Sequence, residues 1–505
     1  MDSTDHRIVK QIFKIALATQ SIVTLALVFV SQIGAKISFF VLINLLIFKF
    51  ILSHYGWDTK LENSKIVKKF KFIMKMRKIK SQSKSINQSL TMMAKNLLNL
   101  PIQENEEEVD SYLDIKKIYG DNWPFMIPVV RTKDPQVTVR GKKVECISSY
   151  SYLDLCRNEE VQQAAINATK DYSTGNHGPR MLCGNLEILE NLEKRLSKFF
   201  KKEASLVFSS GYLACMSCVA GIARKGDVLL MDKLCHASLK SGAKLSAAKI
   251  VYFKHNDFQD AEKKIKSNKY KKLIMVIEGV YSMDGDIGNL PEARRLADKY
   301  KATLILDEAH SLGAIGKTGR GTEEHFNYEF QADIICGSFT KSLASVGGYI
   351  SCSQNIREFY TFYGQGVVFS APLSAYHAGA AEKALEIIEN QPELVTQLQE
   401  NSTYLRNKFR ENKFDIGDSC TCVCPVIFKD TLQSLEIHRW LLSKGFFSSL
   451  VMAPACSITA PRFRITASSS MTKEEMDNIV EIFIQARSAN KEDKELTSML
   501  EELKI

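Results

Sequence analysis

From Trp123 onward, short runs rich in β-forming residues alternate with helical stretches. The runs include Ala204–Phe208, Leu273–Ile277, Thr303–Leu306 and Asp333–Cys336. Helical stretches such as Glu187–Lys202 and Asn289–Tyr300 lie between them. Parallel strands need a crossover connection, usually a helix, so the alternation predicts a mostly parallel sheet covered by helices. We therefore expect an α/β chain whose large domain has three αβα layers.

The last hundred residues have a different pattern. Two or three helical stretches surround the strand-like segments Thr421–Phe428 and Arg462–Thr466, which predicts a smaller α+β domain. The predicted organisation is a membrane anchor (1–58), a linker (59–118), an N-terminal segment of the catalytic region (119–180), a large domain (181–400) and a small C-terminal domain (401–505).

The N-terminus carries an apolar run. Ile15–Ala35 is uncharged over 21 residues, long enough as a helix to cross a hydrocarbon core of roughly 30 Å. A second apolar stretch, Ile37–Leu52, contains only Lys49 as a charge, and lysine can snorkel. A cleaved signal peptide fits less well, because the first run is long and no small-residue cleavage site separates the two. We expect attachment through one span or a two-span hairpin.

A basic stretch follows the apolar segments. Between Lys60 and Lys84 there are ten lysines and arginines against the acid Glu62, so the net charge of +10 is largely local. Nucleic-acid binding is one explanation of such a run. Its place directly after apolar segments instead favours an anionic cytosolic membrane leaflet. We expect no nucleic-acid partner and a catalytic region in the cytosol.

The 12 cysteines are expected to be reduced thiols rather than a disulfide framework. Cys215-Met-Ser-Cys218 has zinc-ribbon spacing, but no second Cys-x-x-Cys or pair of histidines matches it. Cys420, Cys422 and Cys424 alternate, which predicts one face of a strand rather than a metal site. We expect no metal.

Polar residues follow several predicted strands, at the sheet edge where α/β proteins place their sites. One glycine there opens a helix, and a helix N-terminus with free N–H groups is a ready anion site. The candidate residues in these loops are Gly211, Tyr212, Ser282, Asp307, His310, Ser338, Thr340 and Lys341.

These residue types fit one cofactor, pyridoxal 5′-phosphate. It needs an amine for a Schiff base, a carboxylate that keeps its ring nitrogen protonated, and a phosphate cradle. Lys341 is the candidate amine, Asp307 the carboxylate, and Gly211 with Tyr212 part of the cradle. Alone, an aspartate near a histidine is more often a helix cap or a surface pair. The order phosphate turn, aspartate, lysine is that of the aspartate-aminotransferase-like fold, pyridoxal-phosphate fold type I.

Four motifs resemble the α-oxoamine synthases: Cys235–Ser238, Glu278–Gly285, Asp307–Gly313 and Gly337–Ser342. The resemblance extends from about Trp123 to Ala486, which is nearly the whole of the chain beyond the linker. Within the family, segments 276–285, 337–342 and 454–457 are similar to the catalytic subunit of serine palmitoyltransferases. Segments 178–180, 343–348 and 364–371 are instead similar to the partner subunit, which lacks the lysine that this chain has as Lys341.

The resemblance implies a role for each candidate. His236 would stack on the cofactor ring and help to hold the carboxylate of the amino acid. His310 would hydrogen-bond the phenolic oxygen of the ring. The hydroxyls of Ser338 and Thr340 would contact the phosphate. Ser370 would reach a partner's cofactor across a dimer. The implied catalytic residues are Lys341, His236 and Asp307, and the implied cofactor-binding residues add Gly211, Tyr212, Ser282, His310, Ser338, Thr340 and Ser370.

Substrate binding is implied for Arg464, His236 and Ser151. Arg464 would bind the carboxylate, a task that suits a guanidinium. Arg462 is the alternative, and the spacing to Thr472 favours Arg464. The chain departs from the family pattern at Ser151, where the family has asparagine, at Cys456, where it has threonine, and at Met471, where it has histidine. These departures concern substrate anchoring more than cofactor binding.

The implied activity is condensation of L-serine with a long-chain acyl-CoA, palmitoyl-CoA, to 3-ketosphinganine, CoA and CO2. The implied location is the endoplasmic-reticulum membrane, and the implied assembly is a homodimer or a heterodimer with a second long-chain-base subunit. Two alternatives stay open. One is another α-oxoamine synthase, using glycine and a shorter acyl-CoA. The other is a non-catalytic or regulatory subunit of a heterodimeric enzyme.

Overall fold

The part of the chain that can be placed begins at Trp123. The structure is a computed structural model, and it describes residues 123–131, 136–453, 455–457 and 459–502. The predicted membrane anchor (1–58) and linker (59–118) lie outside the described residues, as does Pro454 of the loop that resembles the catalytic subunit. Within the described ranges, no helix has both the length and the apolar character that a membrane span needs.

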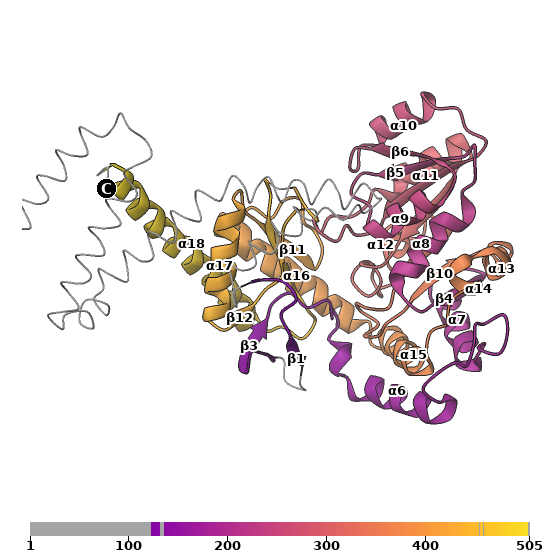
Figure 1. Ribbon diagram of the computed structural model, residues 1–505, viewed down its shortest axis with the longest axis horizontal. Coiled ribbons are helices and arrows are strands. Elements are labelled where there is room, and N and C mark those ends of the chain that lie inside the picture. The colour runs from indigo at the N-terminus through magenta and orange to yellow at the C-terminus, as the bar shows by residue number, and fades with distance from the viewer. Residues whose placement is uncertain (1–122, 132–135, 454, 458, 503–505) are drawn as a thin grey trace, which may run out of the picture. The chain divides into compact units, whose positions relative to one another are not determined.

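A seven-stranded sheet lies at the centre of the large domain (Figure 1). Its order is β4-β10-β9-β8-β7-β5-β6. The strands are β4 (Ala204–Phe208), β5 (Val228–Asp232), β6 (Lys249–Phe253), β7 (Leu273–Glu278), β8 (Thr303–Asp307), β9 (Ile334–Ser338) and β10 (Gly348–Cys352). Only β10 runs antiparallel to its neighbours, so the predicted mostly parallel sheet is confirmed. The carboxyl ends of the other six strands therefore share one edge.

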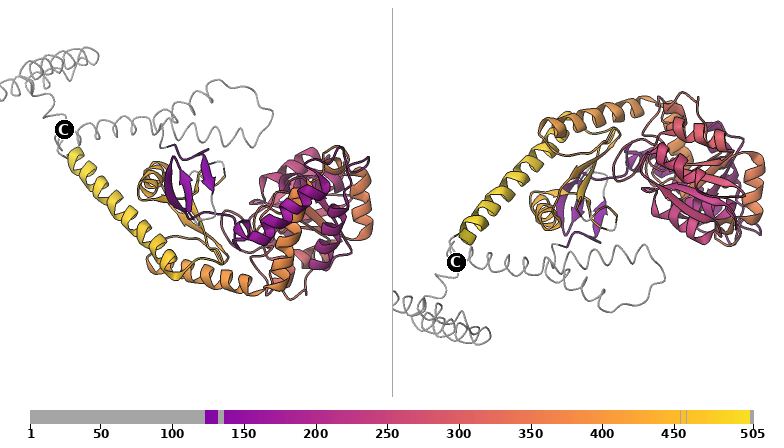
Figure 2. Two further views of the ribbon diagram at one scale, coloured as in Figure 1. Left: turned by 90° about the horizontal axis from the view of Figure 1, so that it is seen from below. Right: turned by 90° about the horizontal axis from the view of Figure 1, so that it is seen from above.

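Helices cover both faces of this sheet, which gives the predicted three layers (Figure 2). On β8, Leu304 and Leu306 pack into one buried cluster and Ile305 packs into the other. Because both faces are covered, these strands are continuous apolar runs. One cluster takes in α6 (Glu159–Tyr172), α7 (Glu187–Phe199), α10 (Phe258–Lys266), α11 (Leu290–Tyr300) and α15 (Ala375–Asn390), and the other α8 (Gly211–Ile222), α9 (Ala237–Leu245), α13 (Gln354–Tyr363) and α14 (Gln365–Val368).

The C-terminal part is an α+β unit, as predicted. β11 (Val423–Ile427), β14 (Arg462–Thr466) and β13 (Leu450–Val451) form an antiparallel sheet in that order. The helices around it are α16 (Glu393–Glu411), α17 (Thr431–Ser443) and α18 (Lys473–Glu502). The predicted alternation of three cysteines along one strand is wrong. The strand begins at Val423, and Cys420 is exposed whereas Cys422 and Cys424 are buried.

A second small sheet joins distant parts of the chain. Its order is β1 (Val129–Arg131), β2 (Gln136–Val139), β3 (Lys142–Cys146) and β12 (Phe446–Phe447), and β12 lies parallel to β3. The chain that leaves β3 then runs beside β14. The N–H of Thr466 donates to the carbonyl of Ile147, and the Thr466 hydroxyl donates to the carbonyl of Ser149 at 2.6 Å. Tyr152 is thereby brought to the strand that carries Arg464.

Candidate active site

An acid and a lysine lie at the carboxyl ends of adjacent strands. Asp307 is the last residue of β8 and is buried, and Lys341 follows the end of β9. One Asp307 oxygen accepts from the N–H of Ala309 at 2.9 Å. The other accepts from the Cys215 thiol of α8 at 3.4 Å. The carboxylate is therefore held from two sides.

Burial lowers the pKa of Lys341. The charge of Asp307 acts in the opposite direction, and the charge of Arg464 adds to the lowering. The net effect makes the neutral amine more accessible than for a lysine in water. A neutral amine is what both a nucleophile and a general base require.

His236 caps the N-terminus of α9. Its Nδ1 lies 2.7 Å from the Ser238 hydroxyl, and its backbone N–H donates to the buried carboxyl of Glu278. Burial lowers the pKa of His236, Asp307 raises it, and Lys341 lowers it again. The imidazole is exposed at the same edge of the sheet and interacts with both charged groups.

The turn between β4 and α8 forms a cradle. The Ser210 hydroxyl accepts from the N–H of Leu213 at the start of the helix. Gly211 packs against Ser338 so closely that a Cβ at position 211 would overlap the serine side chain. The Ser338 and Thr340 hydroxyls lie 2.8 Å apart, and the Tyr212 hydroxyl lies 2.7 Å from that of Ser241.

Arg464 is fully buried on β14. Its Nε donates to the carbonyl of Ser282 at 2.6 Å, and its Nη2 donates to the Tyr152 hydroxyl at 2.9 Å. The guanidinium also stacks over the ring of Tyr150, 4.2 Å from its centroid. Nη1 has no hydrogen-bond partner among the described residues. An unsatisfied buried donor on a fixed charge is suited to an anionic ligand.

His310 lies beside Arg464. Its Nδ1 is 2.7 Å from the Tyr152 hydroxyl and 3.5 Å from Nη2 of Arg464. Burial lowers the pKa of His310 well below its usual range, and the charges of Lys341, Arg464 and His236 add to the effect. The imidazole is therefore neutral at physiological pH.

Two of the candidates from the sequence, Ser370 and Ser151, form no hydrogen bond with these groups in the described part of the chain. The Ser370 hydroxyl donates to the carbonyl of Ala371 at 3.2 Å. Ser151 lines a neighbouring cavity of about 640 Å³ together with Thr466, Ser468, Ser470, Met471 and Thr472. Ser151 and Met471, two positions at which the chain differs from the family pattern, therefore line the same cavity. Cys456 is apart from them, with its thiol directed at the carbonyl of Val451 at 3.5 Å.

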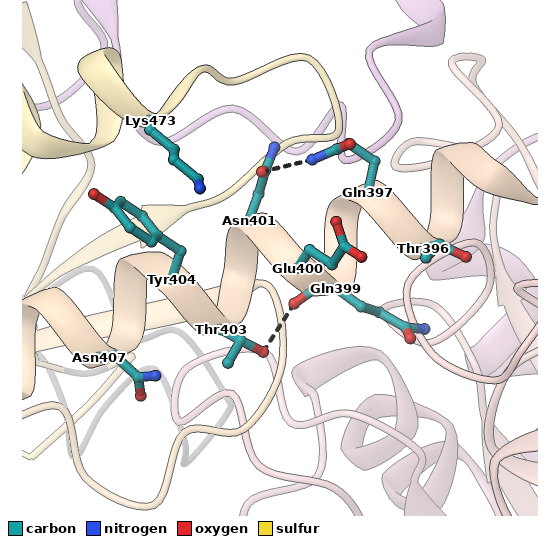
Figure 3. A pocket seen from close by; sticks show the side chains of 9 residues that line it. All are labelled: Thr396, Gln397, Gln399, Glu400, Asn401, Thr403, Tyr404, Asn407 and Lys473. Atoms are coloured by element: carbon teal, nitrogen blue, oxygen red, sulfur yellow. Dashed lines mark hydrogen bonds between the residues drawn. The ribbon is translucent and has the colours of Figure 1, made fainter.

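A further cavity of about 560 Å³ lies along α16 (Figure 3). It is lined by residues of that helix and by Lys473 at the start of α18. None of the candidate residues lines it, so it is separate from the strand-end constellation.

Tyr152 and Cys215 are not among the site residues that the sequence motifs predict. Tyr152 was visible only as a neighbour of Ser151, and nothing local linked it to His310 or Arg464. Cys215 was considered only as part of a zinc-type motif. The structure instead groups Cys215 with Asp307 and Cys336, with ligand atoms within 4.8 Å of one another. A hydrogen bond with Cys336 lowers the pKa of Cys215, but burial and Asp307 outweigh it and the pKa is about 11. A protonated thiol donates to the aspartate and is a poor metal ligand.

The constellation fits pyridoxal phosphate. Lys341 and Asp307 supply an amine and a carboxylate that interact across adjacent strand ends. The glycine at position 211 lets the N-terminus of α8 lie directly against Ser338, so that the free N–H groups of the helix stand beside two hydroxyls. Nη1 of Arg464 is a buried donor without a hydrogen-bond partner among the described residues, which suits an anionic ligand.

Comparisons with known proteins agree with this assignment. Residues 143–483 match the family Aminotransferase class I and II. The 8-amino-7-oxononanoate synthase of Thermoanaerobacter pseudethanolicus is 35% identical over 69% of this chain and 89% of its own. The serine palmitoyltransferase of Bacteroides thetaiotaomicron is 34% identical over 73% of this chain and 93% of its own. In structure, the Sphingomonas wittichii serine palmitoyltransferase is similar with a TM-score of 0.74, at 26% identity, over 78% of this chain and 99% of that one.

The matches cover almost the whole length of these relatives, and both enzyme names belong to one group of acyl-transferring synthases. The chain therefore belongs to the aminotransferase class I and II family and, within it, to the α-oxoamine synthases, whose cofactor is pyridoxal 5′-phosphate.

Proposed function

We propose that the chain condenses L-serine with a long-chain acyl-CoA, palmitoyl-CoA, to give 3-ketosphinganine, CoA and CO2. The observation that carries the amino-acid half is the buried guanidinium of Arg464. Its Nη1 has no partner among the described residues, and it shares its surroundings with Lys341 and His310. A carboxylate bound there would bring the α-carbon of the amino acid to the lysine amine.

Each side chain then has a physical task. Pyridoxal phosphate, when bound, supplies the electron sink for the bond that breaks at the α-carbon. Lys341, with its pKa lowered by burial, takes the proton from that α-carbon. With the cofactor bound, Asp307 would hold the positive charge of a protonated ring nitrogen. The Gly211 turn with Ser338 and Thr340 would bind the phosphate, and Arg464 with His236 would orient the amino-acid carboxylate.

The acyl half of the proposal rests on the N-terminal sequence. An apolar run at Ile15–Ala35, followed by basic residues, suits an enzyme whose acyl substrate and product are both lipids. We place the chain on the endoplasmic-reticulum membrane with its catalytic region in the cytosol. In cell fractions, the full chain should resist carbonate extraction and be cut by protease added to intact microsomes. Release by carbonate alone would contradict this placement.

A second candidate is supported by the relatives named 8-amino-7-oxononanoate synthase, which match as well as those named serine palmitoyltransferase. The comparison that separates the two is substrate preference of the purified full chain. Serine with palmitoyl-CoA should be turned over faster than glycine or alanine with short acyl-CoAs. The reverse order would favour the second candidate.

A non-catalytic subunit is the other alternative, because segments 178–180 and 364–371 resemble a partner subunit. The variant Lys341→Ala distinguishes a catalytic chain from a non-catalytic subunit. In cells that depend on this chain for the synthase, Lys341→Ala should abolish activity, whereas Lys317→Ala, which changes an exposed lysine, should not. Unchanged activity with Lys341→Ala would make the chain a scaffold.

A further inference from the structure

Three side chains from distant parts of the sequence form one buried hydrogen-bonded group. Tyr152 and Arg464 are fully buried and His310 is nearly so. The Tyr152 hydroxyl lies 2.9 Å from Nη2 of Arg464 and 2.7 Å from Nδ1 of His310. It is the atom that both of the other groups contact.

The donors and acceptors in this group can be assigned one by one. Arginine has donors and no acceptor, so the Tyr152 oxygen accepts from Arg464. The tyrosine then has its own proton left to donate, and Nδ1 of His310 is the acceptor at 2.7 Å. Nη2 of Arg464 is a second donor facing Nδ1, at 3.5 Å. With Nδ1 accepting, the single proton of the neutral imidazole is on Nε2.

The electrostatics keep every member in the state that this assignment needs. Burial raises the pKa of Tyr152, so the hydroxyl stays protonated. Burial lowers the pKa of His310, and the charges of Lys341, Arg464 and His236 lower it further. The ring of Tyr150 packs edge-on against His310, with 6.0 Å between the ring centroids.

We propose that Tyr152 is a positioning residue that fixes His310 as the Nε2–H tautomer and ties it to the guanidinium that binds the amino-acid carboxylate. Through this hydroxyl, the group that contacts the cofactor ring and the group that contacts the substrate are held as one unit. The carboxylate role of Arg464 rests on the proposed function, whereas the tautomer of His310 does not.

The tautomer is tested directly by ¹⁵N spectra of the full-length holoenzyme labelled at histidine. The chain has nine histidines, and His310→Asn identifies the signal of His310 by its loss. We expect an Nδ1 shift typical of an acceptor and a protonated Nε2. A protonated Nδ1 in the wild-type enzyme would overturn the proposal, and this measurement needs no Tyr152 variant.

The coupling is tested with Tyr152→Phe and a matched control. Tyr360→Phe also removes one buried hydroxyl, which donates to the carbonyl of Cys218 in the second half of α8. Without its tyrosine donor, His310 should gain a proton more readily. The added positive charge beside Lys341 should make the lysine-bound cofactor lose its own proton more easily, so its visible absorption should titrate at lower pH. The dissociation constant of the amino acid should rise roughly tenfold, the scale of one hydrogen bond to a charged group.

The control should titrate like the wild type. If Tyr152→Phe matched Tyr360→Phe in both the absorption titration and amino-acid binding, and differed from the wild type only in stability, the proposal would be wrong. A different preferred amino acid would overturn the proposed function but leave the tautomer and the titration as predicted.

Discussion

Two arginines on one strand differ in what they can bind. Arg462 of β14 is paired with Asp284 at 2.7 Å and donates to the carbonyl of Met283 at 3.0 Å. Arg464 keeps Nη1 without a partner among the described residues. The spacing in the sequence favours Arg464 over Arg462 as the carboxylate ligand, and the free donor on Arg464 supports the same choice.

This difference gives a matched pair of variants. Arg464→Gln should raise the KM of the amino acid at least about tenfold, because a charge-assisted hydrogen bond to the carboxylate is lost. Arg462→Gln should lower stability and leave that KM nearly unchanged. Steady-state kinetics over a range of amino-acid concentrations measures both. A larger KM effect from Arg462→Gln would show that the carboxylate site is elsewhere.

His438 of α17 links folding to pH. It is 1% exposed, and burial lowers its pKa to about 4 from 6.5. The unfolded chain therefore binds this proton at a higher pH than the folded chain does. Above pH 6.5 this histidine is neutral in both states and the free energy of unfolding is at its full value. As the pH falls from 6.5 towards 4, protonation of the unfolded chain lowers the free energy of unfolding by about 3 kcal/mol at most.

Urea unfolding at several pH values checks this. His438→Gln should flatten the fall in unfolding free energy between pH 6.5 and 4 relative to the wild type, whatever its effect at pH 7. An unchanged slope would mean that other groups cause the acid sensitivity.

Among the elements, the turn from β4 into α8 leaves no room for a side chain at its glycine. A Cβ on Gly211 would overlap Ser338 at the end of β9, which is the hydroxyl that we assign to the phosphate. Gly175 is a suitable control, since a Cβ there would meet no described atom within 4 Å and its φ is not positive.

Gly211→Ala should therefore weaken pyridoxal-phosphate binding by at least an order of magnitude in its dissociation constant, because one of the two strand ends must move. Gly175→Ala should bind the cofactor as the wild type does. Fluorescence titration of the cofactor-free proteins gives both constants. Equal binding by the two variants would place the phosphate elsewhere.

The strands and helices of the large domain were easier to predict from the sequence than the short strands that pair with segments far away along the chain. Thr303–Leu306 falls within β8, and Asn289–Tyr300 matches α11 with Asn289 as its N-cap. The predicted helix from Glu187 is shorter than expected and ends at Phe199. β12 has only two residues and pairs with β3, which lies 301 positions earlier in the chain. So short a segment has no periodicity to detect.

The candidate site shows the same limit. Lys341, Asp307 and His310 could be found because each is the last residue of a strand with a strong apolar pattern or lies within three residues of its end. Tyr152 could not, because its partners come from β14 and from the end of β8. Only the fold brings the three segments together.

At the scale of the whole molecule, two large apolar side chains near the partner-like segments are exposed to solvent. Leu182 is 79% exposed and Phe369 is 84% exposed, and both lie in or next to segments that resemble a partner subunit. We expect the purified chain, 56.9 kDa, to sediment in detergent at twice its protein mass. Phe369→Ser should increase the monomer fraction, whereas a fully active monomer would contradict a dimeric enzyme.

The central claim is that this chain alone is a serine-dependent synthase, and CoA release tests it most directly. The full chain, purified in detergent and loaded with pyridoxal phosphate, would be given palmitoyl-CoA with and without L-serine. We predict serine-dependent CoA release that Lys341→Ala abolishes. No release from a preparation that still shows the absorbance of the lysine-bound cofactor would contradict the claim and mean that another chain completes the site.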